Sequence, residues 1–307
     1  MQRKKTKRPR HMLAISFFVT FFALAGVYSV FYVSVLTPHV DVGKLPQSIP
    51  PYTSFWASYV PANALQFGFQ NYTKVRSLNS SFPPEITLLQ LVKPPEAINT
   101  SQVNYFLDIT FAQPNASMSI VFMNSQDYLN FQAPLQTLVG YGEEFENATL
   151  YSVAVSPGSS PVLGWLALIP HDRAVAFAAG ASEAKQILEL SLDSAAHPSK
   201  SVLSRTDVTA ALYIVGGVAD HVGIGEQNFQ GVVSGGLMTV TAVDSVGQVL
   251  YVKNVVAFES SAAAMAHYSD VHKGFPGAQQ YTVYDSFVLA QEEDPLSKLG
   301  GDYRIVL

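Results

Sequence analysis

An uninterrupted apolar stretch near the start of the sequence constrains this chain more than any other feature. Residues 12–36 contain no charged side chain. At a rise of about 1.5 Å per residue, a helix of that length spans about 37 Å, enough to cross a hydrocarbon core of about 30 Å with some tilt. Six cations lie within residues 1–10 and the first carboxylate is Asp41, which predicts a cytoplasmic N-terminus. We therefore expect a cytoplasmic basic tail (1–11), a transmembrane signal anchor (12–36) in the cell membrane, and the remaining chain outside.

A cleavable signal peptide is the alternative to an anchor. Ala23, Leu24 and Ala25 resemble the small-residue site at which such peptides are cut. The apolar run nevertheless continues for eleven residues past Ala25, which favours an uncleaved helix. Ala25 and Ser29 lie one turn apart, so they form either a small-residue packing face for a neighbouring helix or an ordinary lipid-facing surface.

Charge and cysteine content limit the chemistry of the outer part. Without the six N-terminal cations, 12 basic and 23 acidic residues remain, so the outer part carries a formal net charge of about −11. This balance, with no basic cluster after residue 10, disfavours nucleic acid as a partner. The sequence contains no cysteine, which excludes disulfides, thiolate metal sites and cysteine nucleophiles.

The outer sequence alternates short apolar runs with turn signals, which predicts an α+β fold rich in β-strand. Four prolines within residues 38–51 predict an extended, Pro-rich stalk over residues 37–51. Runs of β-branched and aromatic residues predict strands over 105–111, 118–123, 150–155, 163–169, 174–177, 211–215, 238–243, 249–258 and 281–290. Helices are expected over 125–139, 182–192 and 260–268.

A strand that leads directly into a helix starting with serine recurs in the sequence. The pattern occurs at 119–131, 174–188 and 254–268. The serines positioned as helix N-caps are Ser125, Ser182 and Ser260. If the recurrence reflects duplication, the ectodomain consists of two similar halves, residues 52–198 and 199–307. The alternative is one β-rich extracytoplasmic domain with packed helices and no internal repeat.

Five Asn-x-Ser/Thr sequons predict N-linked glycans, and therefore an outside location. The acceptor residues are Asn71, Asn79, Asn99, Asn115 and Asn147. Because all of them lie in the first half, we expect that half to face solvent and the second half to face a partner or the membrane. Sequons in a chain without cysteine fit an archaeal surface protein better than a eukaryotic secreted one.

Patterns typical of metal binding and catalysis are weak. His267, Asp270 and His272 are weak candidates for a metal site because imidazole and carboxylate groups suit zinc or copper. A helical spacing of five places the two histidines on different faces, however, so we interpret them as surface residues and assign no metal site. The acidic runs at 143–146 and 292–294 lack the central glycine of a calcium loop. We assign no catalytic residue and no cofactor.

These observations favour a non-enzymatic, single-pass surface glycoprotein that mediates protein interaction, as an accessory subunit of a membrane complex or as an envelope component. The expected partners are the lipid bilayer, N-linked glycans and a membrane or envelope protein. A tethered binding protein for a small solute, metal or glycan is the first alternative, with the loops around 267–272 or an aromatic groove near Trp56 or Trp165 as its site. An exported hydrolase is the second, and it requires the fold to bring together residues such as Asp108, His171 or His221.

Overall fold

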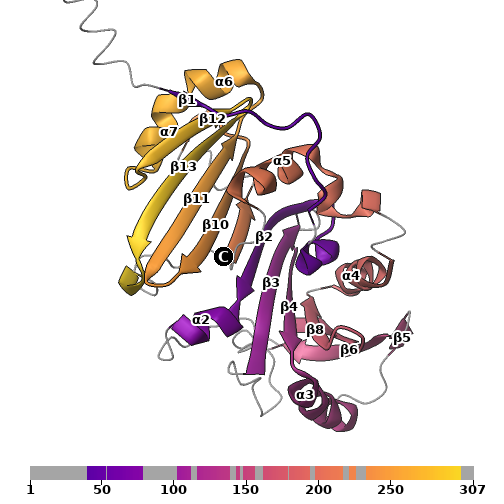
Figure 1. Ribbon diagram of the computed structural model, residues 1–307. Coiled ribbons are helices and arrows are strands. Elements are labelled where there is room, and N and C mark those ends of the chain that lie inside the picture. The colour runs from indigo at the N-terminus through magenta and orange to yellow at the C-terminus, as the bar shows by residue number, and fades with distance from the viewer. Residues whose placement is uncertain are drawn as a thin grey trace, which may run out of the picture. The chain divides into compact units, whose positions relative to one another are not determined.

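The computed structural model describes residues 40–52, 54–78, 102–111, 116–138, 143–145, 148–155, 162–178, 180–193, 198–216, 221–225 and 233–298. The described residues from Val42 onward belong to one compact unit. Within the described residues, thirteen strands form one sheet to which a few helices are added (Figure 1). The predicted α+β class is therefore confirmed. The predicted anchor, 12–36, lies outside the described residues, and no helix among those described is long and apolar enough to cross a membrane.

The sheet has longer strands in its interior and a very short strand at each edge. Its order is β1-β12-β13-β11-β10-β9-β2-β3-β4-β8-β7-β6-β5. The strands are β1 (Asp41–Val42), β2 (Ala64–Asn71), β3 (Val103–Phe111), β4 (Ala116–Met123), β5 (Glu143–Phe145), β6 (Ala148–Val155), β7 (Val162–Ile169), β8 (Ala174–Ala178), β9 (His221–Gly225), β10 (Met238–Val246), β11 (Val249–Ala257), β12 (Gln280–Tyr284) and β13 (Phe287–Pro295). The two edges, β1 and β5, are two and three residues long, which leaves little free backbone for pairing with another chain.

The helices are short and are inserted between strands. The α-helices are α2 (Tyr72–Leu78), α3 (Ser125–Leu138), α4 (Ala181–Asp193), α5 (Thr206–Val215), α6 (Ser261–Ala266) and α7 (Tyr268–Gly274). Single 3-10 turns occur at η2 (Phe55–Tyr59), η5 (Pro198–Lys200), η6 (Val202–Ser204) and η7 (Leu296–Lys298).

Alternating side chains give the sheet two faces with separate cores. The first face carries residues such as Phe67, Leu107 and Val255, and it is covered by η2, α4 and α5. The second face is covered by α3 at the β4 and β8 side, where Tyr128 joins the apolar cluster, and by α6 and α7 at the β12 and β13 side. Helices therefore cover both faces, and on the second face α2 also contacts β3 in the middle of the sheet, where its Tyr72 joins the same apolar cluster (Figure 1).

Most predicted strands are confirmed, but two predicted strands need correction and others were missed. Residues 211–215, predicted as a strand, belong to α5, which ends at Gly216 with a left-handed φ of 95°. In this helix Leu212 and Val215 are buried against the core, whereas Tyr213 is 42% exposed, so the burial follows the period of a helix although the residues have β-propensity. The predicted strand 281–290 is two strands joined by a tight turn at Asp285. Strands β1, β2, β5 and β9 were not predicted.

The three predicted serine caps have different outcomes. Ser260 caps α6, since its Oγ accepts the Ala263 N–H at 3.2 Å. In α3 the cap is Asn124, one residue earlier, whose Oδ1 accepts the Asp127 N–H at 2.9 Å. Ser182 lies inside α4 and donates to Glu183 Oε2 at 2.9 Å instead.

Residues 43–52 run along the domain and are called the strap here. Gly43 N–H donates to Val283 O of β12 at 2.8 Å, which ties the start of the strap to the sheet. Leu45, Ile49 and Tyr52 of the strap pack against the main core. The part of the predicted stalk that the structure describes within this domain is therefore held against the core.

The two sides of the sheet repeat one strand order about the central β2·β9 pair. Moving outwards, β2-β3-β4-β8-β7 on one side corresponds to β9-β10-β11-β13-β12 on the other. In the central pair Gly68 faces Gly223, so the pairings make Ser119 of β4 equivalent to Asn254 of β11. Two of the three sequence repeats, 119–131 and 254–268, therefore occupy equivalent places, whereas 174–188 does not.

Candidate functional site

A row of polar side chains crosses the middle of the second face. On β3 and β4, Asp108 and Ser119 face each other, and Ser119 Oγ donates to Asp108 Oδ1 at 2.6 Å. Burial raises the pKa of Asp108, an effect that the hydrogen bond from Ser119 opposes. Ser119 is 1% exposed, so its hydroxyl is out of reach of a substrate in solution. A carboxylate and a hydroxyl at this distance resemble a base and a nucleophile, but their burial favours a structural role.

The equivalent row in the second half of the sheet, on the same face, carries uncharged polar side chains. Thr241 Oγ1 donates to Asn254 Oδ1 at 2.7 Å, at the same place relative to the central pair. Gly223 lies next to Thr241 in β9, and a Cβ added there would meet nothing within 4 Å. Each half thus fixes its central strands with one cross-strand side-chain hydrogen bond, and these bonds occupy the polar groups.

The weak metal candidates do not form a ligand set. His267 Nδ1 lies 3.1 Å from Asp270 Oδ2, and this contact holds the pKa of Asp270 below its usual value. The His267 ring stacks on Phe258, with centroids 5.8 Å apart, whereas the His272 ring stacks on Tyr281 at 4.4 Å. Each imidazole is therefore placed by a different aromatic side chain. Across the described part of the chain, no three His, Asp or Glu side chains are grouped to hold an ion.

The predicted acidic runs lie in strands rather than in loops. Glu143 is in β5 and pairs with Lys185 Nζ at 2.8 Å. Residues 292–294 belong to β13, where successive side chains point to opposite faces. In the part of the two runs that the structure describes, no oxygen ligands converge.

The residues on which a hydrolase would depend bond to different partners and not to one another. Asp108 bonds to Ser119, and His171 Nε2 pairs with Asp172 at 2.9 Å on the β7–β8 turn. His221 is the first residue of β9, and the structure does not describe its side chain.

Trp56 lies in the core and does not line a groove. It is 1% exposed and contacts Tyr52, Phe67 and Phe69, with ring centroids 5.4–5.5 Å apart. Trp165 on β7 is half-buried. An aromatic groove around Trp56 is therefore excluded by its burial, and the aromatic content of this region contributes to packing.

Of the predicted glycan acceptors, only Asn71 lies within the described residues. It ends β2, and its Oδ1 accepts the Lys74 N–H at 3.0 Å at the start of α2. The remaining acceptors are Asn79, Asn99, Asn115 and Asn147, which lie outside the described residues.

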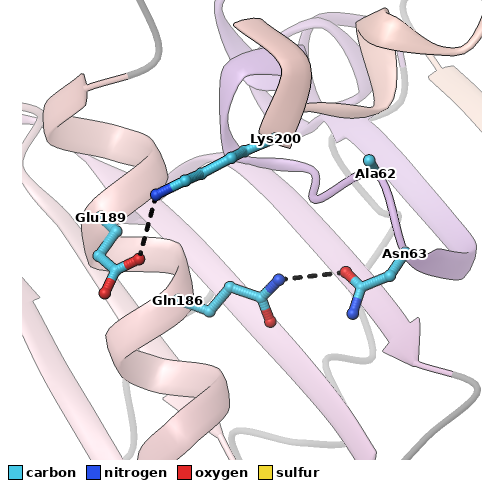
Figure 2. Close-up of a pocket in the computed structure, with 5 residues that line it drawn as sticks. All are labelled: Ala62, Asn63, Gln186, Glu189 and Lys200. Carbon is cyan, nitrogen blue, oxygen red and sulfur yellow. Dashed lines mark hydrogen bonds and ion pairs between the residues drawn. The ribbon is translucent and has the colours of Figure 1, made fainter. Parts of the chain in front are cut away.

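A hollow of about 440 Å³ lies between α4 and the turn that precedes β2 (Figure 2). It is lined by Ala62, Asn63, Gln186, Glu189 and Lys200. Gln186 Nε2 donates to Asn63 Oδ1 at 3.1 Å, and Lys200 Nζ lies 3.7 Å from Glu189 Oε2. The backbone behind it is fixed, since Ala62 N–H donates to Lys200 O at 2.8 Å.

The hollow was not found from the sequence because its residues come from three distant segments. The volume is in the range of small-molecule sites, and amide and charged groups converge on it. Its polar groups bind one another, so the arrangement is suited to reversible hydrogen bonding with a solute rather than to proton transfer.

Comparisons with known proteins give a fold-level likeness only. No protein-family model matches the chain, and no curated protein matches it. Among solved structures, the chain is similar to crystal form I of TP0453, with 8% identity and a TM-score of 0.48 over 83% of this chain and 96% of that one. Crystal form IV of TP0453 gives 8% identity and a TM-score of 0.45 over 82% and 95% of the two chains. Crystal form III gives 7% identity and a TM-score of 0.44 over 83% and 97%.

Proposed function

We propose that this chain is a membrane-anchored, non-enzymatic surface protein whose outer domain binds another protein, as an accessory subunit of a membrane complex or as an envelope component. The observation that carries the proposal is the strap. The predicted anchor ends at residue 36, and Gly43 is already hydrogen-bonded to β12. A domain joined so closely to its anchor is held in place beside neighbouring membrane proteins, whereas a long flexible linker would let it move freely.

The state of the polar side chains supports a non-enzymatic role. The hydroxyl of Ser119 is buried against Asp108, and His267 is engaged by Asp270. In the described residues these groups satisfy one another, as expected of a scaffold.

The test is to identify the proteins that remain associated with the full chain after mild detergent extraction from native membranes. On a native gel we expect it to migrate with other membrane proteins, above its own mass. The matched control is a variant in which a cleavable signal replaces residues 12–36, and it should lose that association. Migration of the unaltered chain alone, at monomer mass, would count against the proposal.

Binding of a small neutral solute is a second candidate, and the hollow beside α4 favours it. A polar solute would replace the Gln186–Asn63 hydrogen bond with bonds of its own. Thermal melting across a panel of polyols and amides should then show a raised melting temperature that Gln186→Ala abolishes. Gln248→Ala, at an exposed turn, is the control. A panel without any shift removes this candidate.

The repeated strand order also supports duplication, with halves 52–198 and 199–307. In both halves three strands come first, a helical segment follows, and a strand pair comes last, β7–β8 in the first half and β12–β13 in the second; the first half has β5 and β6 in addition, before its pair. If the second half retains the ancestral pairing, the fragment 199–307 should associate with itself through β9. Light scattering that finds only unfolded or monomeric fragment would weaken this interpretation.

A further inference from the structure

The strap meets the sheet at one particular end, called the Leu237 end here. In that end row, Met238, Ala257, Phe287 and Tyr284 pair across β10, β11, β13 and β12. Gly43 bonds to Val283, directly beside this row. The chain that comes from the predicted anchor therefore joins the domain at the Leu237 end.

The length of chain between anchor and sheet is small. Six residues lie between Leu36 and Gly43, and the seven steps along the chain reach only about 25 Å even when fully extended. The sheet is longer than that, because the nine residues of β10 span about 30 Å. If the anchor spans the membrane as proposed above, the Leu237 end is held close to the bilayer, and Val246 marks the far end of β10.

Three exposed apolar side chains lie at the Leu237 end, the end that the short linker would hold close to the bilayer. Val42 is 69% exposed, Leu237 57% and Met265 49%. Leu237 directly precedes β10, and Met265 lies on α6, which starts just after β11 and is drawn at the same end in Figure 1. The turn before Leu237 also contacts this helix pair, since Gly235 lies against the His267 ring. Single exposed apolar residues are ordinary, but three at the tethered end form a surface suited to lipid.

The charges around these residues point to the type of lipid contact. Asp41, Glu259 and Asp285 are exposed there, with Lys44 as the neighbouring cation. Attraction to anionic lipid requires a cluster of basic residues, which the described residues of this surface do not provide. The contact should therefore be apolar and should form equally well on zwitterionic lipid.

We propose that the Leu237 end rests in the headgroup region of the membrane that holds the anchor, with Val42, Leu237 and Met265 in contact with lipid. This proposal rests on the proposed anchor. It adds a fixed orientation, in which the sheet stands on the bilayer and presents the Val246 end outwards to partners.

The absence of cysteine allows a direct test with the full chain. Leu237→Cys and Val246→Cys are matched, since both side chains are exposed, at 57% and 61%, and they flank the same strand. Each variant is labelled with an environment-sensitive fluorophore in phosphatidylcholine nanodiscs. We expect a blue-shifted emission, and a loss of fluorescence on adding headgroup spin-labelled lipid, at position 237 and not at 246. Met265→Cys is a second probe of the same end and should behave like position 237.

The outcomes separate this proposal from the anchor itself. Equal quenching at both positions, or none at 237, overturns the orientation if the chain still resists alkaline carbonate extraction. Extraction by carbonate would overturn the anchor, and the orientation with it. Stronger quenching at 237 only when anionic lipid is added would contradict the apolar contact. Shielding of position 237 in native membranes but not in nanodiscs would identify a protein occupant and overturn the lipid assignment.

Discussion

Replacing Gly43 with alanine should loosen the strap, and the structure gives the size of the effect. A Cβ at this position would overlap the Tyr284 ring, lying 2.5 Å from Cδ1 and 2.6 Å from Cζ. Ordinary carbon contacts are at about 3.5–4.0 Å, and Cε1 of the same ring would lie closer still, so the ring or the strap must move by more than about 1 Å. Overpacking of this kind costs about 1–3 kcal/mol in the free energy of unfolding. Urea denaturation of the full chain in detergent, followed by tryptophan fluorescence, measures the loss.

A double-mutant cycle isolates the cause of that loss. In a Tyr284→Ala background the ring is gone, so Gly43→Ala should cost at most about 0.5 kcal/mol. Gly223→Ala is the control, because a Cβ there meets nothing within 4 Å. It should be neutral or stabilise by about 0.4–1 kcal/mol, since alanine restricts the unfolded chain. An equal cost of Gly43→Ala in both backgrounds would refute the steric reasoning.

Three further changes test other parts of the domain. Lys253 Nζ donates to Val215 O at 2.9 Å, at the C-terminus of α5. Lys253→Met should therefore lower the free energy of unfolding, measured in urea, by about 1–2 kcal/mol. The control Lys273→Met, at an exposed site, should change it by less than about 0.5 kcal/mol. Trp56→Ala should cost about 3–5 kcal/mol in the same assay, and a smaller loss would contradict its place in the core. Because burial raises the pKa of Asp108, the folded state holds its proton more tightly than the unfolded state does, so its contribution to stability is present below the ordinary aspartate pKa and is lost as pH rises through the raised value. Asp108→Asn should remove that part of the pH dependence, which urea titrations at several pH values would measure.

Local sequence patterns predicted those strands that carry large side chains on both faces. Branched and aromatic residues marked β3, β7 and β11, and the structure confirms each of them. Strand β9 was missed because Gly223 and Gly225 provide no side chain at two of its five positions, which leaves no continuous run of branched or aromatic residues to mark a strand. Its strand conformation depends on pairing with β2 and β10, which sequence periodicity does not report.

In the candidate sites, too, the sequence indicated contacts between residues close in the chain and missed contacts between residues far apart in it. The His267–Asp270 contact spans three residues within one helical segment, so its spacing was visible. The hollow joins Asn63 to Gln186, which are 123 residues apart, and only the fold brings them together. The buried Asp108–Ser119 bond was likewise invisible, since neither residue belongs to a recognisable motif.

The strap also sets an order of events during synthesis. Gly43 leaves the ribosome early, but its hydrogen-bond partner Val283 is made 240 residues later. At about 5–20 residues per second, that interval lasts roughly 12–50 s. For that time Gly43 has no β12 to pair with, and Phe287 and Leu289, two members of the core cluster against which Leu45 and Ile49 pack, are also missing. A truncation that removes β12 should therefore leave the start of the domain open to proteases, although the missing residues lie at the opposite end of the chain.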